Sequence, residues 1–365
     1  FLCVLCLSQK GMVIKMKKFN INLKGRVKNF DLPENKSLFP LFEAVVNSMQ
    51  AIEERKKLCS FDGSIVIKIE REETISNEVL GRINNICITD NGIGFNENNY
   101  NSFLESDSDY KSEIGGKGVG RFSWLKAFKS VSVDSCFEDN GHFYERAFEF
   151  SLSNDGVDDT VIETVAEHPS TTIKLCSFID NYKKNAPLKL DEIAIKMIQH
   201  CFVYFLSSDC PIVVLSDDQN SSINLNDLFK TKIILAEERE TFTVENEKFC
   251  LTKLRVSGDI IRDHKLYLCA NNRLVETKDL SKSIIDLDKA LGEEQKFWVL
   301  GIVTSPYLDN NVDMNRLSFS IPENADDGFC PIVTISKIVN IAVFLIEQYL
   351  NEYLKPIAEE KRKRI

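Results

Sequence analysis

Hydrophobic residues follow a helical spacing in four segments of this chain. The clearest is 38–56, where apolar positions recur three or four residues apart and Pro40 lies near the start, where its missing N–H costs little. We predict further helices at 120–129 and 189–206, and one long helix over 332–362. Each has an apolar side, so each is expected to pack against a neighbouring element.

Short apolar runs between these helices predict β-strands. The predicted strands cover residues 18–30, 64–71, 84–90, 130–136, 142–151 and 171–177. Residues 96–119 are mostly polar, and we expect a mobile stretch there. Because the strands are clustered in pairs between helices, the pattern favours an α+β fold, in which helices cover one face of a mixed sheet.

The composition is typical of a globular protein. Apolar residues make up 43% and charged residues 27% of the 365 residues, and this length suits two domains of ordinary size. No apolar run is long enough to span a membrane, so we expect a cytoplasmic protein with no membrane partner. Eleven scattered cysteines favour reduced thiols over a disulfide framework. The net charge of −10 argues against binding nucleic acid over the whole surface.

Two polar residues lie close together on the predicted helix 38–56. Glu43 and Asn47 are four residues apart and therefore project from the same face, one turn from each other. Asparagine is disfavoured inside a helix, because its side chain competes for backbone hydrogen bonds. A carboxylate beside an amide could activate a water and hold Mg²⁺, which prefers oxygen ligands. A solvated polar stripe is the alternative for the pair taken alone.

A turn containing two glycines follows the predicted strand 84–90. Asp90 ends the strand, and Gly92 and Gly94 follow within four residues. A carboxylate held at a strand end could accept a hydrogen bond from an exocyclic amine such as that of adenine. The glycines would allow a ligand to approach the backbone closely. An ordinary turn is the alternative.

A glycine-rich run leads into the predicted helix 120–129. It contains Gly115, Gly116, Lys117, Gly118, Val119 and Gly120. Unpaired N–H groups at the start of a helix favour phosphate, and Lys117 adds a positive charge. The run is not a Walker A loop, because Arg121 and Phe122 follow the last glycine. A flexible loop is the alternative.

In this order, the three motifs resemble the N, G1 and G2 boxes of the GHKL (Bergerat-fold) ATPases. That superfamily includes DNA gyrase B subunits, MutL-type mismatch-repair proteins, MORC proteins, large heat-shock chaperones and sensor histidine kinases. The resemblance implies that Glu43 is the general base, that Asn47 is the Mg²⁺ ligand and that Asp90 contacts the adenine amino group. Gly92 and Gly94 would form the turn beside the base. The lid over the phosphates would consist of Gly115, Gly116, Lys117, Gly118, Val119 and Gly120.

A further family element is a threonine on a strand near the adenine-contacting aspartate. Thr171 matches it, although Ser170 stands where the family usually has glycine. Residues 265–275 resemble a hairpin in the second domain of MutL and gyrase B subunits, which has the ribosomal-protein-S5-domain-2 fold. Residues 309–319 can be aligned with the MutL segment that carries the transducer lysine. In that alignment Arg316 occupies the lysine position, which the resemblance implies reaches towards the γ-phosphate.

The resemblance implies a Bergerat-fold α/β sandwich followed by an S5-domain-2-like transducer domain. We expect a non-native or flexible arm at 1–17, the GHKL ATP-binding domain at 18–210, the transducer domain at 211–325 and a C-terminal helix at 326–365.

The implied activity is hydrolysis of ATP to ADP and phosphate with Mg²⁺. Lid closure and a nucleotide-dependent homodimer would act as a conformational switch. One alternative is a nucleotide-gated interaction module with little hydrolysis, whose client is DNA or a protein. A histidine-kinase-like domain fits less well, because Glu43 favours attack by water and the four histidines lack the context of a phosphoacceptor.

Overall fold

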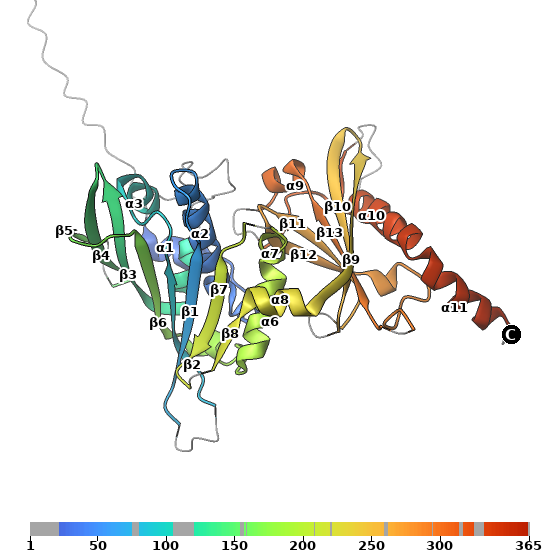
Figure 1. Ribbon diagram of the computed structural model, residues 1–365, viewed down its shortest axis with the longest axis horizontal. Helices are drawn as coiled ribbons and strands as arrows, with labels where there is room; N and C mark the ends of the chain where they lie inside the picture. Colours follow the sequence, from blue (N-terminus) through green and yellow to red (C-terminus); the bar gives the residue numbers. More distant parts are fainter. Residues whose placement is uncertain are drawn as a thin grey trace, which may run out of the picture.

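The computed structural model describes residues 22–74, 80–104, 120–153, 157, 159–207, 209–219, 221–258, 262–293, 295–313, 317–324 and 332–363. The expected arm at 1–17, the lid residues 115–119 and the transducer residue Arg316 lie outside these ranges. Two sheets lie side by side along the longest axis of the molecule, with α7 and α8 between them (Figure 1).

The first sheet has eight strands in the order β5-β4-β3-β6-β2-β1-β7-β8. Its strands are β1 (Ser64–Arg71), β2 (Ile83–Asp90), β3 (Phe128–Asp139), β4 (His142–Ser151), β5 (Asp159–Thr164), β6 (Ser170–Phe178), β7 (Ile212–Asp217) and β8 (Ser222–Asn224). Neighbouring strands are antiparallel, except that β7 runs parallel to β1. The predicted α+β class with a mixed sheet is confirmed.

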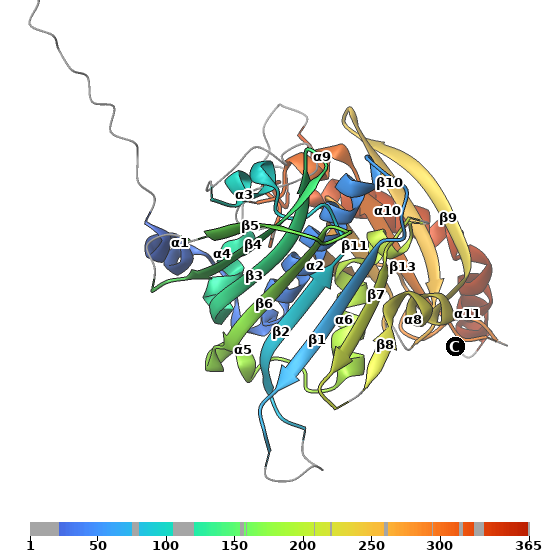
Figure 2. The same ribbon diagram turned by 60° about the vertical axis from the view of Figure 1, so that its left-hand side comes forward.

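Helices cover one side of this sheet, as Figure 2 shows for α2, α4 and α6. The helices of this part are α1 (Leu23–Asn29), α2 (Phe39–Lys56), α3 (Glu97–Leu104), α4 (Gly120–Ala127), α5 (Asp180–Lys183), α6 (Leu190–His200) and α7 (Phe202–Phe205). Strand β1 buries alternate residues, while Val66 on its other face is 46% exposed. The sheet is therefore packed on one face, as the strand pattern predicts.

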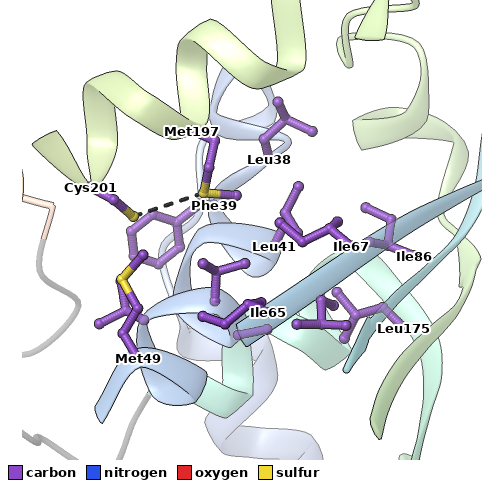
Figure 3. Close-up of a cluster of buried hydrophobic side chains, with 14 of the residues drawn as sticks. Leu38, Phe39, Leu41, Met49, Ile65, Ile67, Ile86, Leu175, Met197 and Cys201 are labelled. Atoms are coloured by element: carbon purple, nitrogen blue, oxygen red, sulfur yellow. Dashed lines mark hydrogen bonds between the residues drawn. The ribbon is translucent and has the colours of Figure 1, made fainter. Parts of the chain in front are cut away.

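The first core lies between α2 and the sheet. Leu41 and Met49 of α2 are fully buried and lie against Ile65 and Ile67 of β1 (Figure 3). The same apolar cluster continues into the second sheet, where Tyr267 meets the ring of Phe202 at 6.4 Å between centroids. The two sheets thus share buried apolar surface, which favours one docked arrangement.

The second sheet has five strands in the order β12-β11-β13-β10-β9, with β11 parallel to β13. Its strands are β9 (Ile233–Val244), β10 (Glu247–Val256), β11 (Lys265–Ala270), β12 (Arg273–Asp279) and β13 (Trp298–Thr304). Helix α8 (Leu225–Lys232) leads into it, and α9 (Pro306–Asn310), α10 (Ile335–Tyr349) and α11 (Asn351–Lys363) follow. No helix in the described ranges has the length and apolarity needed to cross a membrane.

Several sequence predictions differ from the structure. The strand predicted at 18–30 is wrong from residue 22 onwards: α1 forms there, because the Asn22 side chain accepts a hydrogen bond from Gly25 N (3.0 Å) and caps the helix. The mobile stretch predicted at 96–119 contains α3. The predicted long helices divide, at Cys201 and at Leu350.

Strands β7 and β8 come from residues that the expected organisation places in the second domain. They complete the first sheet, because β7 pairs with β1 in parallel from Ser64↔Ile212 to Ile69↔Asp217. Strand β8 then pairs with β7 and precedes α8. In the structure the passage from one sheet to the other therefore runs through α8.

Candidate functional site

The polar residues singled out in the sequence meet around one cavity between α2, α4 and the sheet. Its volume is about 130 Å³, and it opens to the solvent at its mouth. Its lining includes Glu43, Asn47, Asp90, Gly94, Gly120 and Thr171. These residues come from α2, the end of β2 and the turn after it, α4 and β6, so only the tertiary fold brings them together.

Asp90 lies at the sheet end of the cavity with its carboxylate held on both sides. The side chain is 4% exposed, Ser48 Oγ donates to Oδ2 at 2.7 Å, and Gly92 N donates to Oδ1 at 2.8 Å. Ser48 comes from α2, so this hydrogen bond also joins the helix to the strand end. A carboxylate with about four lone-pair sites retains capacity for a further donor.

Thr171 lies directly opposite Asp90 in the β2–β6 register. Its hydroxyl shares a 2.9 Å hydrogen bond with Ser135 Oγ of β3, and Ser135 Oγ also accepts from Phe95 N at 2.9 Å. Thr171 therefore lies beside Asp90 in the sheet. The hydrogen bonds around it connect β3 and β6 with the turn after β2.

The two glycines after β2 have different reasons to be glycine. Gly94 has φ of +83°, and a Cβ there would lie 2.3 Å from the carbonyl oxygen of Cys136. Gly92 is packed against α2, where a Cβ would come within 2.7 Å of Ala51 Cβ. Gly94 lines the cavity, whereas Gly92 is not among its lining residues and holds the turn from behind.

The cavity wall is completed by residues that the sequence did not single out. Phe95, Phe103 and Trp124 contribute aromatic surface, and Arg121 lies over Phe103 and donates to Ser102 O at 3.2 Å. Two buried polar atoms of the lining, Asn99 Oδ1 and Trp124 Nε1, have no hydrogen-bond partner in the described part of the chain. Buried polar groups are normally paired, so these two atoms are suited to a polar ligand. Of these residues, Arg121 could have been singled out from the sequence, because it directly follows the glycine-rich run.

Glu43 lies at the other end of the cavity and is 1% exposed. Gly120 packs against its carboxylate so closely that a Cβ there would lie 2.3 Å from Oε2. The other oxygen, Oε1, is 3.3 Å from Nη1 of Arg273, which belongs to β12 in the second sheet. Asn47, half-buried one turn along α2, lines the same cavity.

A second, smaller cavity, too narrow to hold a water molecule, lies on the far side of Glu43. It is lined by Glu43, His200 and Arg273, among others. His200 stacks on Phe42 with ring centroids 4.6 Å apart, and burial lowers its pKa to about 4. The imidazole is therefore neutral near pH 7, and it does not act as a counter-charge for the glutamate.

Comparison of the sequence with models of protein families and with curated proteins gives no match. The function must therefore be inferred from the geometry and chemistry of the cavity.

Proposed function

We propose that the protein is a Mg²⁺-dependent ATPase with a Bergerat-type nucleotide-binding domain and an S5-domain-2-like transducer domain. One observation carries the proposal. Six residues from four segments, each matched in the sequence to a nucleotide-contacting position, line a single cavity: Glu43, Asn47, Asp90, Gly94, Gly120 and Thr171. An unrelated set of turns and polar stripes has no reason to converge in this way.

Asp90 would recognise the base. Ser48 and Gly92 orient its carboxylate, whose oxygens would accept the exocyclic N–H of adenine. The aromatic walls of the cavity suit a planar base, since aromatic rings favour stacked or edge contacts. Thr171, held by Ser135, offers a further hydroxyl beside the carboxylate.

Glu43 would act as the general base. Its carboxylate lines the cavity at the end away from Asp90, where it accepts a proton from the water that attacks the terminal phosphate. Asn47 supplies a side-chain oxygen one turn away, a donor type that Mg²⁺ accepts when phosphates complete its ligands. The described residues contain no group of three or more histidine, cysteine, aspartate or glutamate side chains that could hold a metal unaided. When bound, Mg²⁺ neutralises charge on the phosphates.

The phosphates would lie towards the start of α4. Gly120 is the first residue of that helix, and the N–H groups of a first turn favour anions. The expected lid at 115–119 precedes it directly. We propose that lid closure and a nucleotide-dependent homodimer couple binding to a conformational switch, with turnover limited by lid movement.

Substitution at each end of the cavity tests the assignment. Glu43→Ala should retain ATP and lose hydrolysis by about 100-fold or more, whereas Asp90→Asn should lose nucleotide binding. Equilibrium binding of a fluorescent ATP analogue and phosphate release measure the two effects separately. Glu53→Ala is the matched control, because Glu53 is an exposed carboxylate on the same helix. Full hydrolysis by Glu43→Ala would refute the proposal.

One observation favours a second candidate, a nucleotide-gated interaction module with little hydrolysis. The contact between Glu43 and Arg273 joins the cavity to the second sheet, so nucleotide binding could act on the arrangement of the two sheets whether or not hydrolysis follows. The output would then be assembly with a second copy or with a DNA or protein client. Measuring particle mass with ATP, with a non-hydrolysable analogue and without nucleotide separates the candidates. Assembly that is identical in all three conditions would exclude a nucleotide switch of either kind.

A further inference from the structure

Arg273 is the residue of the second sheet that reaches the proposed catalytic carboxylate. Its side chain is 3% exposed, and Nη1 lies 3.3 Å from Oε1 of Glu43. Glu43 lines both the large cavity and the small one behind it, whereas Arg273 lines only the small one. The guanidinium therefore approaches the carboxylate from behind and leaves its other oxygen on the cavity side.

The backbone around Arg273 is held in place by a tight turn. Asn271 and Asn272 have φ of +51° and +60°, which suits a two-residue turn between antiparallel strands. Asn271 N donates to Asp309 Oδ1 at 2.6 Å, and its side-chain amide donates to Asp309 O at 3.3 Å. Asp309 belongs to α9, so the position of Arg273 depends on how α9 and the β11–β12 hairpin pack together.

Three neutral side chains and one further charged group, Lys36, surround the contact between Glu43 and Arg273; Lys36 acts electrostatically on His200. Burial lowers the pKa of His200 to about 4 and raises the pKa values of Cys201 and Tyr204, so all three are neutral near pH 7. Nε, Nη1 and Nη2 of Arg273 are buried without a hydrogen-bond partner in the described ranges. Two charges buried together are each costly without the other, so removing one leaves the other uncompensated.

We propose that Arg273 is a positioning residue that orients the Glu43 carboxylate, so that hydrolysis requires the second sheet to be docked against the first part of the molecule. This inference rests on the proposed ATPase function. Without the guanidinium, the buried carboxylate loses the charged group that lies 3.3 Å from its Oε1 and is no longer held from behind in one orientation. Strand β12, which carries Arg273, packs against α6 and α7 of the first part of the molecule. Because Glu43 lies on α2 in that part, a movement of the second sheet would change the distance between Arg273 and Glu43.

Arg273→Met and Arg273→Lys test the role, with Lys278→Met on the same strand as the matched control. Both Arg273 variants should bind an ATP analogue within twofold of the unchanged protein. Their kcat should fall by about 100-fold for methionine and by about tenfold for lysine, because an ammonium supplies the charge without the planar fork. A purely structural role would weaken ATP-analogue binding and kcat together, and lysine would not restore part of the lost kcat.

A double-mutant cycle supplies a readout that does not depend on hydrolysis. The free energies of unfolding of Glu43→Gln, Arg273→Met and the double variant are measured by urea unfolding. The losses in the two single variants should not add up to the loss in the double variant, since each single change removes the same ion pair. Arg273→Lys serves in both assays if the methionine variant does not fold.

The outcomes separate the two proposals. Equal hydrolysis by the unchanged protein and Glu43→Ala would refute the ATPase assignment and, with it, the role of Arg273. Hydrolysis that depends on Glu43, together with an unchanged kcat in the Arg273 variants, would overturn only the inference about Arg273. Additive effects in the unfolding cycle, or faster hydrolysis by Arg273→Met, would also overturn it.

Discussion

The two buried carboxylates of the cavity are held in opposite ways. Asp90 accepts hydrogen bonds from Ser48 and Gly92, within the first sheet and its helix. Glu43 faces Arg273 from the second sheet at 3.3 Å, and the three guanidinium nitrogens have no hydrogen-bond partner in the part of the chain that the structure describes. The Asp90 contacts therefore lie within one sheet and its helix, whereas the Glu43–Arg273 contact joins two sheets and depends on how they dock.

In the proposed function, this difference would suit two tasks. The Asp90 end is assembled by strand register and one helix contact, so it would be preformed for recognising the base. The Glu43 end depends on how two sheets dock, so the arrangement of the sheets would influence hydrolysis there. The following substitutions test whether the contrast holds.

The largest expected effect is at the ion pair. Arg273→Met should lower the free energy of unfolding by about 3–5 kcal/mol, because it leaves a buried carboxylate without its counter-charge. Lys278→Met should change it by less than about 1 kcal/mol, since the ion pairs of Lys278 are near the surface. Urea unfolding measures both. A cost for Arg273→Met as small as that of the control would mean that the pair does not hold the two sheets.

A smaller loss in the free energy of unfolding is expected on acidification, because His200 is kept neutral in the folded protein. Its pKa is lowered from 6.5 to about 4 in the folded protein, so the unfolded state binds a proton that the folded state excludes. The free energy of unfolding should therefore fall as the pH drops from about 6.5 to 4, by up to about 3 kcal/mol from this group.

His200→Phe isolates this contribution. Phenylalanine keeps a ring against Phe42 but cannot bind a proton, so the pH dependence of unfolding should flatten between pH 4 and 6.5. His142→Phe is the control, because that side chain is 63% exposed. An unchanged slope in His200→Phe would show that the imidazole is not kept neutral by burial.

The smallest effect is expected at the Asp90 end. Ser48→Ala removes one donor from the carboxylate and should lower the free energy of unfolding by about 1.5 kcal/mol. If the same hydrogen bond orients Asp90 for adenine, affinity for an ATP analogue should fall by about tenfold. Ser132→Ala, on β3 away from Asp90, should change neither quantity. Unchanged affinity in Ser48→Ala would separate the hydrogen bond from ligand recognition.

Much of the first domain could be predicted from local patterns. Helix α2 and strands β1 and β2 have strong periodicity, and their predicted bounds agree with the structure within a residue. The region of α1 was predicted as a strand, although a single cap hydrogen bond at Asn22 favours the helix. Strand β5 was not predicted, because its residues are nearly all exposed and carry no burial pattern.

Part of the candidate site could likewise be predicted from local sequence patterns, and part could not. The spacing of Glu43 and Asn47 is a property of the helix, and the Asp90 turn is a property of its residues. Ser48 could not be singled out, because a serine on an apolar helix has no distinguishing local signal. Arg273 belongs to a hairpin that the sequence did identify, yet nothing in the sequence indicates its contact with Glu43.

The sequence by itself determined the elements, the polar residues that break their apolar patterns, and the resemblance that orders those residues into a nucleotide pocket. Only the tertiary structure decided which of them share a cavity and that Arg273 lies against Glu43. The physical reason is the distance along the chain between the residues that interact. Helical spacing, turns and caps depend on neighbours within a few residues. Strand register and the docking of two sheets depend on buried surface between segments that are far apart in the chain.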